Sequence, residues 1–229
     1  MSDPGTDART IRVAEAPLLG DIGGYLARLL RLDPNGLVRL RGRSASAGGD
    51  RITLWATPLG VLTRGDARAS LTGGADTTVD ARALLAAVEP VFDAGSTAVA
   101  LPAGQDTAWR ASLPPESGWR LVDEVPGEVV VDLAEQAAST VRSAPNPTIA
   151  GEALLDHPVL VVSGDSAAAG EPAEEVDVPL RVVQAAVRMG FLTPGDPVRV
   201  GVSGNWLAVS TPRGVVYRRT GQVNLLTLS

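Results

Sequence analysis

The only histidine of the chain lies in a segment that could carry out acid–base chemistry. His157 stands in the run LLDHPVL, directly after Asp156 and before Pro158. A carboxylate that bonds an imidazole can orient it as a general base. Adjacent side chains on an extended segment point to opposite faces, however, so Asp156 and His157 are poorly placed to bond each other. We therefore predict no catalytic residue here.

The other residue types exclude several kinds of enzyme site. The chain has no cysteine, which excludes disulfides, thiolate nucleophiles and thiolate metal sites, and one histidine excludes a site that needs two imidazoles. The run SGDS at 163–166 lacks the G-x-S-x-G spacing of a nucleophile elbow. The glycine pairs at 48–49 and 73–74 lack the spacing of a phosphate-binding loop. These patterns favour a protein that is not an enzyme and has no cofactor.

An acidic cluster lies in the segment 164–177. Glu171, Glu174, Glu175 and Asp177 could hold a hard cation through their carboxylates. The cluster lacks the D-x-D-x-D-G spacing of a calcium loop, and a solvated surface loop is the simpler interpretation. We predict no metal site.

Arginine and tryptophan are the residue types best suited to binding a macromolecule. All 20 basic residues are arginines, but the net charge of −6 argues against a nucleic-acid binder held by phosphate contacts alone. A local basic face remains open. Trp55, Trp109, Trp119 and Trp206 fall on predicted strands, where large aromatic side chains usually pack in the core. Trp55 falls on the polar phase of its strand, which makes it a candidate for a binding interface.

An internal repeat supplies the elements that must position these side chains. Residues 25–40, YLARLLRLDPNGLVRL, match residues 185–200, AAVRMGFLTPGDPVRV, at a constant offset of 160. The runs TPLGV at 57–61 and TPRGV at 211–215 match at an offset of 154, and the difference falls in the Gly/Ser-rich run SASAGGD. Exposed hairpin tips tolerate insertions, so we predict that the two stretches form the same structural module.

The pattern within each copy predicts one helix and several short strands. Leu26, Leu29 and Leu30 recur at helical spacing, whereas Val38 and Leu40 alternate with arginines as on a half-buried strand. Asp80 and Pro179 stand where a helix N-cap or first-turn residue belongs. Two further copies are predicted: one has a helix from 79 and strands at 97–101, 109–113 and 119–124, and a degenerate one has an extended piece at 128–131, a helix over 131–141 and a strand at 158–162.

The predicted fold class is α+β. The unit is β-α-β-β-β, it occurs four times, and its antiparallel sheets are covered by helices on one face. Two domains follow, with two units in residues 1–127 and two further units in residues 128–229, the first of these being degenerate.

Four such units in a row resemble the architecture of DNA sliding clamps, in which two units make one domain. The sequence also resembles an uncharacterised protein family of high-GC Gram-positive bacteria. The clamp resemblance implies that exposed helix faces line a hole and carry positive charge to meet phosphates. The predicted helix faces carry Arg28, Arg31, Arg82, Arg142, Arg181 and Arg188 against Asp21, Glu89, Asp93, Asp132 and Glu135. This balance gives no support to encirclement of DNA.

Three functions follow from these patterns. The leading hypothesis is a non-enzymatic cytoplasmic interaction or scaffold protein whose partner is another protein or a second copy of the chain. The alternatives are a clamp-like nucleic-acid accessory factor and a carboxylate-based enzyme or small-molecule binder in a cleft between the domains. The candidate interface residues for a nucleic acid or a protein partner are Arg28, Arg31, Arg82, Arg181, Arg188 and Trp55.

Two features of the sequence bear on location. No apolar run approaches the ~18 residues that a membrane span needs. The N-terminal run MSDPGTDART has acidic residues and no apolar core, unlike a secretory signal. We therefore predict a cytoplasmic protein without a membrane partner. The apolar run at 223–228 is predicted either to close a sheet or to offer an edge to a partner.

Overall fold

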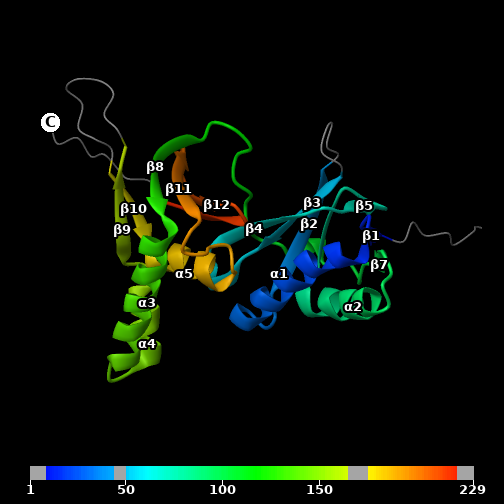
Figure 1. The fold of residues 1–229 in the computed structure, drawn as a ribbon, viewed down its shortest axis with the longest axis horizontal. Coiled ribbons are helices and arrows are strands. Elements are labelled where there is room, and N and C mark those ends of the chain that lie inside the picture. The colour runs from blue at the N-terminus through cyan, green and yellow to red at the C-terminus, as the bar shows by residue number, and fades with distance from the viewer. Residues whose placement is uncertain (1–8, 44–49, 165–174, 221–229) are drawn as a thin grey trace, which may run out of the picture. The chain divides into compact units, whose positions relative to one another are not determined.

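The computed structural model describes residues 9–43, 50–164 and 175–220, and it divides the chain into two compact units. The first unit is Met1–Ser112 and the second is Leu113–Ser229 (Figure 1). The sequence placed this division after Gly127. It lies earlier because strand β8, Arg120–Pro126, pairs with strand β11, Pro197–Ser203, of the second unit. The C-terminal run at 223–228 lies outside the described residues.

The first unit contains two sheets and two helices. Four strands follow one another in the order β6-β2-β3-β4, and three short strands form a second sheet in the order β5-β1-β7. The elements are β1 Thr10–Arg12, α1 Leu19–Leu32, β2 Leu37–Arg43, β3 Arg51–Ala56, β4 Leu62–Ala67, β5 Ser70–Thr72, β6 Asp76–Asp80, α2 Ala81–Asp93 and β7 Ala98–Ala100, with short 3-10 helices at Ala16–Leu18, Pro58–Gly60 and Asp106–Ala108.

Helix α1 packs against one face of the four-stranded sheet. Its buried residues recur at helical spacing, and they meet the buried strand residues Val38, Leu40, Ile52 and Leu54. Burying one such side chain contributes roughly 1.5–3 kcal/mol, so this layer is the main source of stability of the unit. A Cβ atom at Gly65 would lie 2.8 Å from the Tyr25 ring, so only glycine lets the helix come this close.

The second unit contains a four-stranded sheet, a two-stranded sheet and three helices. Its strands follow in the orders β13-β12-β11-β8 and β10-β9. The elements not yet given are α3 Gly127–Ser143, α4 Pro147–Leu154, β9 Pro158–Ser163, β10 Glu175–Pro179, α5 Leu180–Arg188, β12 Trp206–Thr211 and β13 Gly214–Arg219. In the part of the chain that is described, no helix has the length and apolarity needed to cross a membrane.

Strand register confirms the predicted repeat at its offset of 160. Leu40 lies opposite Leu54 in the first unit, and Val200 lies opposite Val209 in the second. A backbone hydrogen bond repeats as well: the Ala81 amide donates to the Gly36 carbonyl (3.1 Å), and the Gly127 amide donates to the Asp196 carbonyl (2.9 Å). Gly36 and Asp196 are related by the same offset of 160 that the sequence shows. The predicted match of TPLGV with TPRGV is wrong, because Ala56 pairs with Thr63 across a long loop, whereas Thr211 pairs with Gly214 across a two-residue turn.

Helix starts follow the predicted signals. Asp80 caps α2, because its Oδ1 accepts a hydrogen bond from the Ala83 amide at 2.7 Å, and Pro179 precedes α5. The degenerate copy differs, because its extended piece is β8 and the residues predicted to be extended at 128–131 already belong to α3.

The prediction of four equal copies is wrong. Complete β-α-β-β-β modules are β1-α1-β2-β3-β4 and β10-α5-β11-β12-β13, whereas β6-α2-β7 and β8-α3-α4-β9 are trimmed modules. The strand expected at 109–113 is absent from these described residues, so Trp109 lies in a loop, and Trp119 just precedes β8. Prolines at 102, 114 and 115 explain the loss, because proline cannot donate to a strand ladder.

Candidate partner-binding face of the first unit

The face of the β6-β2-β3-β4 sheet that points away from α1 is rich in arginine. Side chains alternate along each strand, and residues opposite in register share a face. Arg39 lies opposite Trp55, which lies opposite Arg64; Arg41 lies opposite Thr53 and Asp76. We define the arginine face by five arginines and three carboxylates, namely Arg39, Arg41, Arg43, Arg51, Arg64, Asp66, Asp76 and Asp80.

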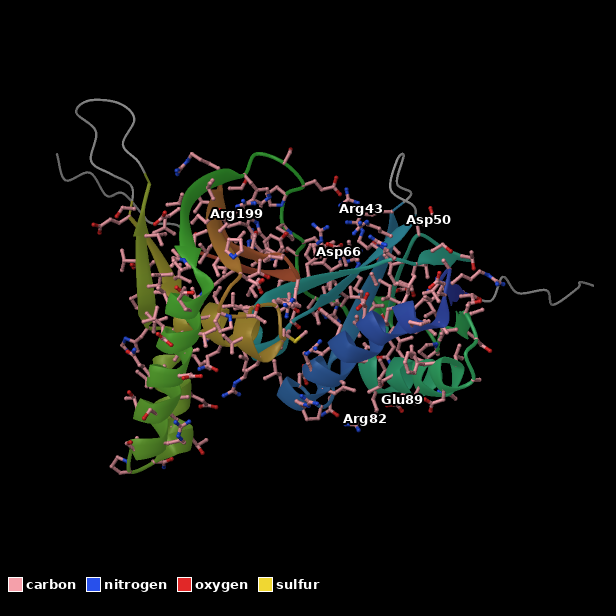
Figure 2. All side chains as sticks on the ribbon, viewed as in Figure 1. Arg43, Asp50, Asp66, Arg82, Glu89 and Arg199 are labelled. Carbon is pink, nitrogen blue, oxygen red and sulfur yellow. The ribbon has the colours of Figure 1, made fainter. Side chains whose placement is uncertain are left out.

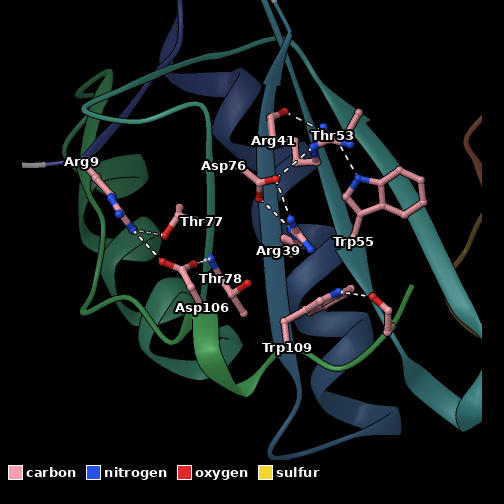
Figure 3. Close-up of polar contacts among 11 residues, drawn as sticks. Arg9, Arg39, Arg41, Thr53, Trp55, Asp76, Thr77, Thr78, Asp106 and Trp109 are labelled. Atoms are coloured by element: carbon pink, nitrogen blue, oxygen red, sulfur yellow. Dashed lines mark hydrogen bonds and ion pairs between the residues drawn. The ribbon is translucent and has the colours of Figure 1, made fainter. Parts of the chain in front are cut away.

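Asp76 on β6 forms ion pairs with two of these arginines. The Arg39 Nε and Nη2 atoms donate to the two Asp76 oxygens at 2.7 Å each, and Arg41 Nε lies 3.2 Å from Asp76 Oδ2 (Figure 3). The hydrogen bonds to Asp76 raise the pKa of Arg39 above its ordinary value. This bidentate pair fixes the guanidinium plane as well as its charge.

Two tryptophans hold arginines of the face by cation–π contact. The Arg64 guanidinium lies 5.8 Å from the Trp55 ring centroid, and the Arg39 guanidinium lies 5.8 Å from that of Trp109. Trp55 Nε1 donates to Thr53 Oγ1 at 3.1 Å. Trp55, which the sequence predicted as an interface residue, is buried, with 6% of its surface exposed. The Trp55 ring therefore holds the Arg64 guanidinium that lies over it.

The segment that carries Trp109 is anchored to β6. Asp106 Oδ1 accepts the Thr78 amide at 2.5 Å, and the Thr78 carbonyl accepts the Gln105 amide at 2.7 Å (Figure 3). The Thr78 amide, followed by Arg9, holds the pKa of Asp106 below its usual range. These bonds position the Trp109 indole beside Arg39.

The helix-face arginines predicted as an interface are divided between the two units. Arg28, Arg31 and Arg82 belong to the first unit, where Arg82 Nη2 donates to the Pro34 carbonyl at 3.0 Å. Figure 2 shows Arg82 and Glu89 on the same helix, α2. Arg188 is exposed on α5 of the second unit.

Arg181 has a structural partner. Its Nε and Nη2 atoms donate to the two Asp156 oxygens at 2.7 and 2.8 Å, and Arg218 Nη2 donates to Asp156 Oδ1 at 2.8 Å. These arginines lower the pKa of Asp156. Asp156 and His157 lie in the turn before β9 and not on the extended segment that the sequence predicted, and both Asp156 oxygens accept hydrogen bonds from arginines.

The described carboxylates give no metal centre. Within the ranges that the structure covers, no group of three or more His, Cys, Asp or Glu side chains could hold a metal ion. Glu175 and Asp177 of the predicted acidic cluster are exposed on β10, and Glu171 and Glu174 lie outside the described residues.

The two units differ in charge. Residues 1–112 contain twelve arginines and twelve carboxylates, and residues 113–229 contain eight arginines and fourteen carboxylates, so the net charge of −6 belongs to the second unit. Helix α3 carries exposed Glu128, Asp132 and Glu135 at helical spacing. This acidic stripe opposes the positive helix face that the clamp resemblance implies.

Several solved structures that are similar to this chain are bacterial sliding clamps. The DNA polymerase sliding clamp from Bacillus subtilis matches with a TM-score of 0.57 at 9% identity, over 95% of this chain and 66% of that chain. The beta sliding clamp from C. crescentus matches with a TM-score of 0.54 at 16% identity, over 92% and 64%. The DNA polymerase III beta chain from Streptococcus pneumoniae matches with a TM-score of 0.54 at 11% identity, over 94% and 65%.

The chain therefore has a clamp-like α+β fold, and the predicted fold class is confirmed. It spans less than two thirds of the length of these clamps. At such low identity the likeness shows the fold alone.

Two family models match the chain, one in each unit. The model described as domain of unknown function DUF8010 matches residues 6–111, and the one described as domain of unknown function DUF8185 matches residues 114–223. No curated protein matches the chain.

The arginine face escaped the sequence analysis, although one signal for it was present. The alternation Arg39, Arg41, Arg43 marks a strand whose polar phase is entirely basic. Arg51 and Arg64 join this face through the pairing of β2 with β3 and of β3 with β4. The register of these pairs cannot be predicted from the sequence.

Proposed function

We propose that this chain is a non-catalytic cytoplasmic interaction protein that uses its arginine face to bind an acidic surface of a partner protein. The observation that supports the proposal is the excess of five arginines over three carboxylates on that face. The cation–π and bidentate contacts hold Arg39 and Arg64 in place before a partner arrives, which lowers the entropic cost of binding.

A protein partner fits this face better than a nucleic acid. Single-stranded nucleic acids bind sheets by stacking bases on exposed aromatic rings, and Trp55 is buried.

The test is binding of a labelled deca-glutamate peptide, followed by fluorescence anisotropy at low and at 0.3 M salt. We expect saturable binding at low salt that the Arg64→Gln variant weakens, because it removes a positioned charge from the face. Arg142→Gln, at an exposed position of α3 in the second unit, is the matched control and should bind like the wild type. Thermal unfolding of each variant checks that the fold is intact. Binding of a dT20 strand in preference to the peptide would contradict the proposal.

A clamp-like nucleic-acid accessory factor is the second candidate. The likeness to sliding clamps favours it, together with the exposed helix arginines Arg28, Arg31 and Arg188. It predicts that a 30-base-pair duplex is retained at low salt and that Arg28→Ala combined with Arg188→Ala weakens retention. No retention at 50 mM salt would exclude this candidate.

A further inference from the structure

Arg43 and Arg51 form an unneutralised pair at the end of the β2–β3 hairpin. They lie directly opposite each other in register, and both are exposed. Among the described residues, neither side chain has a hydrogen bond or an ion pair. Like charges that face each other across two strands are destabilising. No ion pair among the described residues relieves this repulsion.

The rest of the arginine face is different. Arg39 and Arg41 share Asp76, and Arg64 contacts both Asp66 and Trp55. Within the arginine face, Arg43 and Arg51 are the two arginines that have no carboxylate partner among the described residues, so they are available to an anion from outside the chain. Two guanidinium groups present several donors in planes that match the oxygens of a carboxylate or a phosphate.

A small pocket lies at the pair. It has a volume of about 110 Å³ and is lined by Gly42, Arg43, Asp50, Arg51, Ser70, Leu71 and Ala75. Figure 2 shows Arg43 and Asp50 at the same end of the sheet. The Gly42 amide donates to the Ala75 carbonyl at 2.8 Å, which ties the end of β2 to the floor of the pocket. This volume suits one oxyanion group and is far smaller than the 300–1,000 Å³ of a typical small-molecule site.

Asp50 favours a singly charged anion. Its exposed carboxylate lines the pocket without pairing with either arginine, within the part of the chain that is described. Two arginines and one carboxylate leave this pocket with a single net positive charge, which one carboxylate of a ligand neutralises, whereas a phosphate dianion would leave it negative.

We infer that Arg43 and Arg51 are an oxyanion-binding pair that takes one carboxylate of the partner's acidic surface. The inference rests on the proposed function and states which two arginines of the face bind a carboxylate of the partner. The counterpart residues in the second unit are Ser203 and Trp206, which lie opposite each other in the same place of the module, so the pair belongs to the first unit only.

The experiment is an NMR titration of the full chain that follows the arginine Nε–Hε signals. Glutarate and inorganic phosphate are the two probes. We expect glutarate to shift the Arg43 and Arg51 signals saturably, at lower concentration than phosphate. Saturation by phosphate at about tenfold lower concentration than glutarate would overturn the carboxylate assignment. No saturable shift with either probe would overturn the site.

Variants separate this inference from the proposed function. Arg43→Gln and Arg51→Gln should each weaken deca-glutamate binding about tenfold or more, because a charge-assisted bond is lost, while Arg142→Gln, at an exposed position of α3, has no effect. Both variants should unfold at a temperature no lower than the wild type without ligand, since repulsion is relieved. If Arg64→Gln weakens binding and the two pair variants do not, the pair is not the anchor and the proposed function still stands.

Discussion

The two units of this chain are built to the same plan in opposite order. In the first unit the complete module precedes the trimmed one, and in the second unit the trimmed module comes first. Strand β6 pairs with β2 and strand β8 pairs with β11 in matching register, and the amides of Ala81 and Gly127 make equivalent bonds. The contacts between modules therefore define the unit, and the order of the modules along the chain does not.

The sheet faces show where the units diverge. Arg39 and Arg199 are equivalent, and each pairs with a carboxylate on the neighbouring edge strand, Asp76 or Glu124. Trp55 is replaced by Ser210, and the Arg43–Arg51 pair by Ser203 and Trp206. Because the second unit keeps the same strand register without these residues, the fold does not require the arginine face. Its presence in the first unit points to binding.

The contact between modules gives the largest expected effect. A Cβ atom at Gly127 would lie 2.5 Å from the Asp196 carbonyl oxygen and 2.6 Å from that of Thr193, so Gly127→Ala should lower the free energy of unfolding by about 3 kcal/mol. Ala81 holds the equivalent place with its Cβ fully buried, and Ala81→Gly should cost only about 1 kcal/mol. Urea unfolding measures both. Equal losses of stability in the two variants would contradict the expectation that Gly127 has less room for a Cβ atom than position 81 has.

The ion pairs of the two faces should differ by a smaller amount. Asp76→Ala removes the shared partner of Arg39 and Arg41, which are partly buried, and should cost about 1.5 kcal/mol. Glu124→Ala removes the partner of Arg199, where both side chains are about half exposed, and should cost at most ~0.5 kcal/mol. Denaturant midpoints compare them, and a larger loss for Glu124→Ala would reverse the comparison.

The smallest expected effect is a pH dependence present in both units. The pKa of Asp106 is lowered by the Thr78 amide, and the pKa of Asp196 is lowered by the Thr193 hydroxyl. A carboxyl with a lowered folded-state pKa contributes stability above its unfolded value, and this is lost as the pH falls below about 4. Asp106→Asn should therefore be less stable than the wild type at pH 7, with a gap that narrows toward pH 2. Parallel pH profiles of the melting temperature would contradict the assignment.

Features that depend on local chemistry could be predicted from the sequence. The helical spacing of Leu26 and Leu29, the cap at Asp80 and the turn after Thr57 all follow from residues a few positions apart. The two complete modules could be predicted because the sequence match at a constant offset of 160 extends over a helix and the strand that follows it. The clamp-like fold followed from the order of these elements.

Long-range pairing could not be predicted in the same way. Arg181 and Arg218 reach Asp156 from 25 and 62 residues away, so Arg181 looked like a free interface residue. Trp55 was placed on the correct face, but the cover that buries it depends on tertiary packing that local alternation does not encode. Trp109 was placed on a strand because its neighbours favour one, whereas the prolines around it set the loop.

The reversed module order has a consequence for protein engineering. A circularly permuted second unit, starting at β10 and continuing from β13 into β8, would have the chain order of the first unit. The new connection must cross the sheet from β13 to β8, a width of about 14 Å for three strand spacings. Residues 68–75 make the corresponding connection in the first unit, from β4 to β6, and would serve as its template. Such a permutant should keep the register of all four strands.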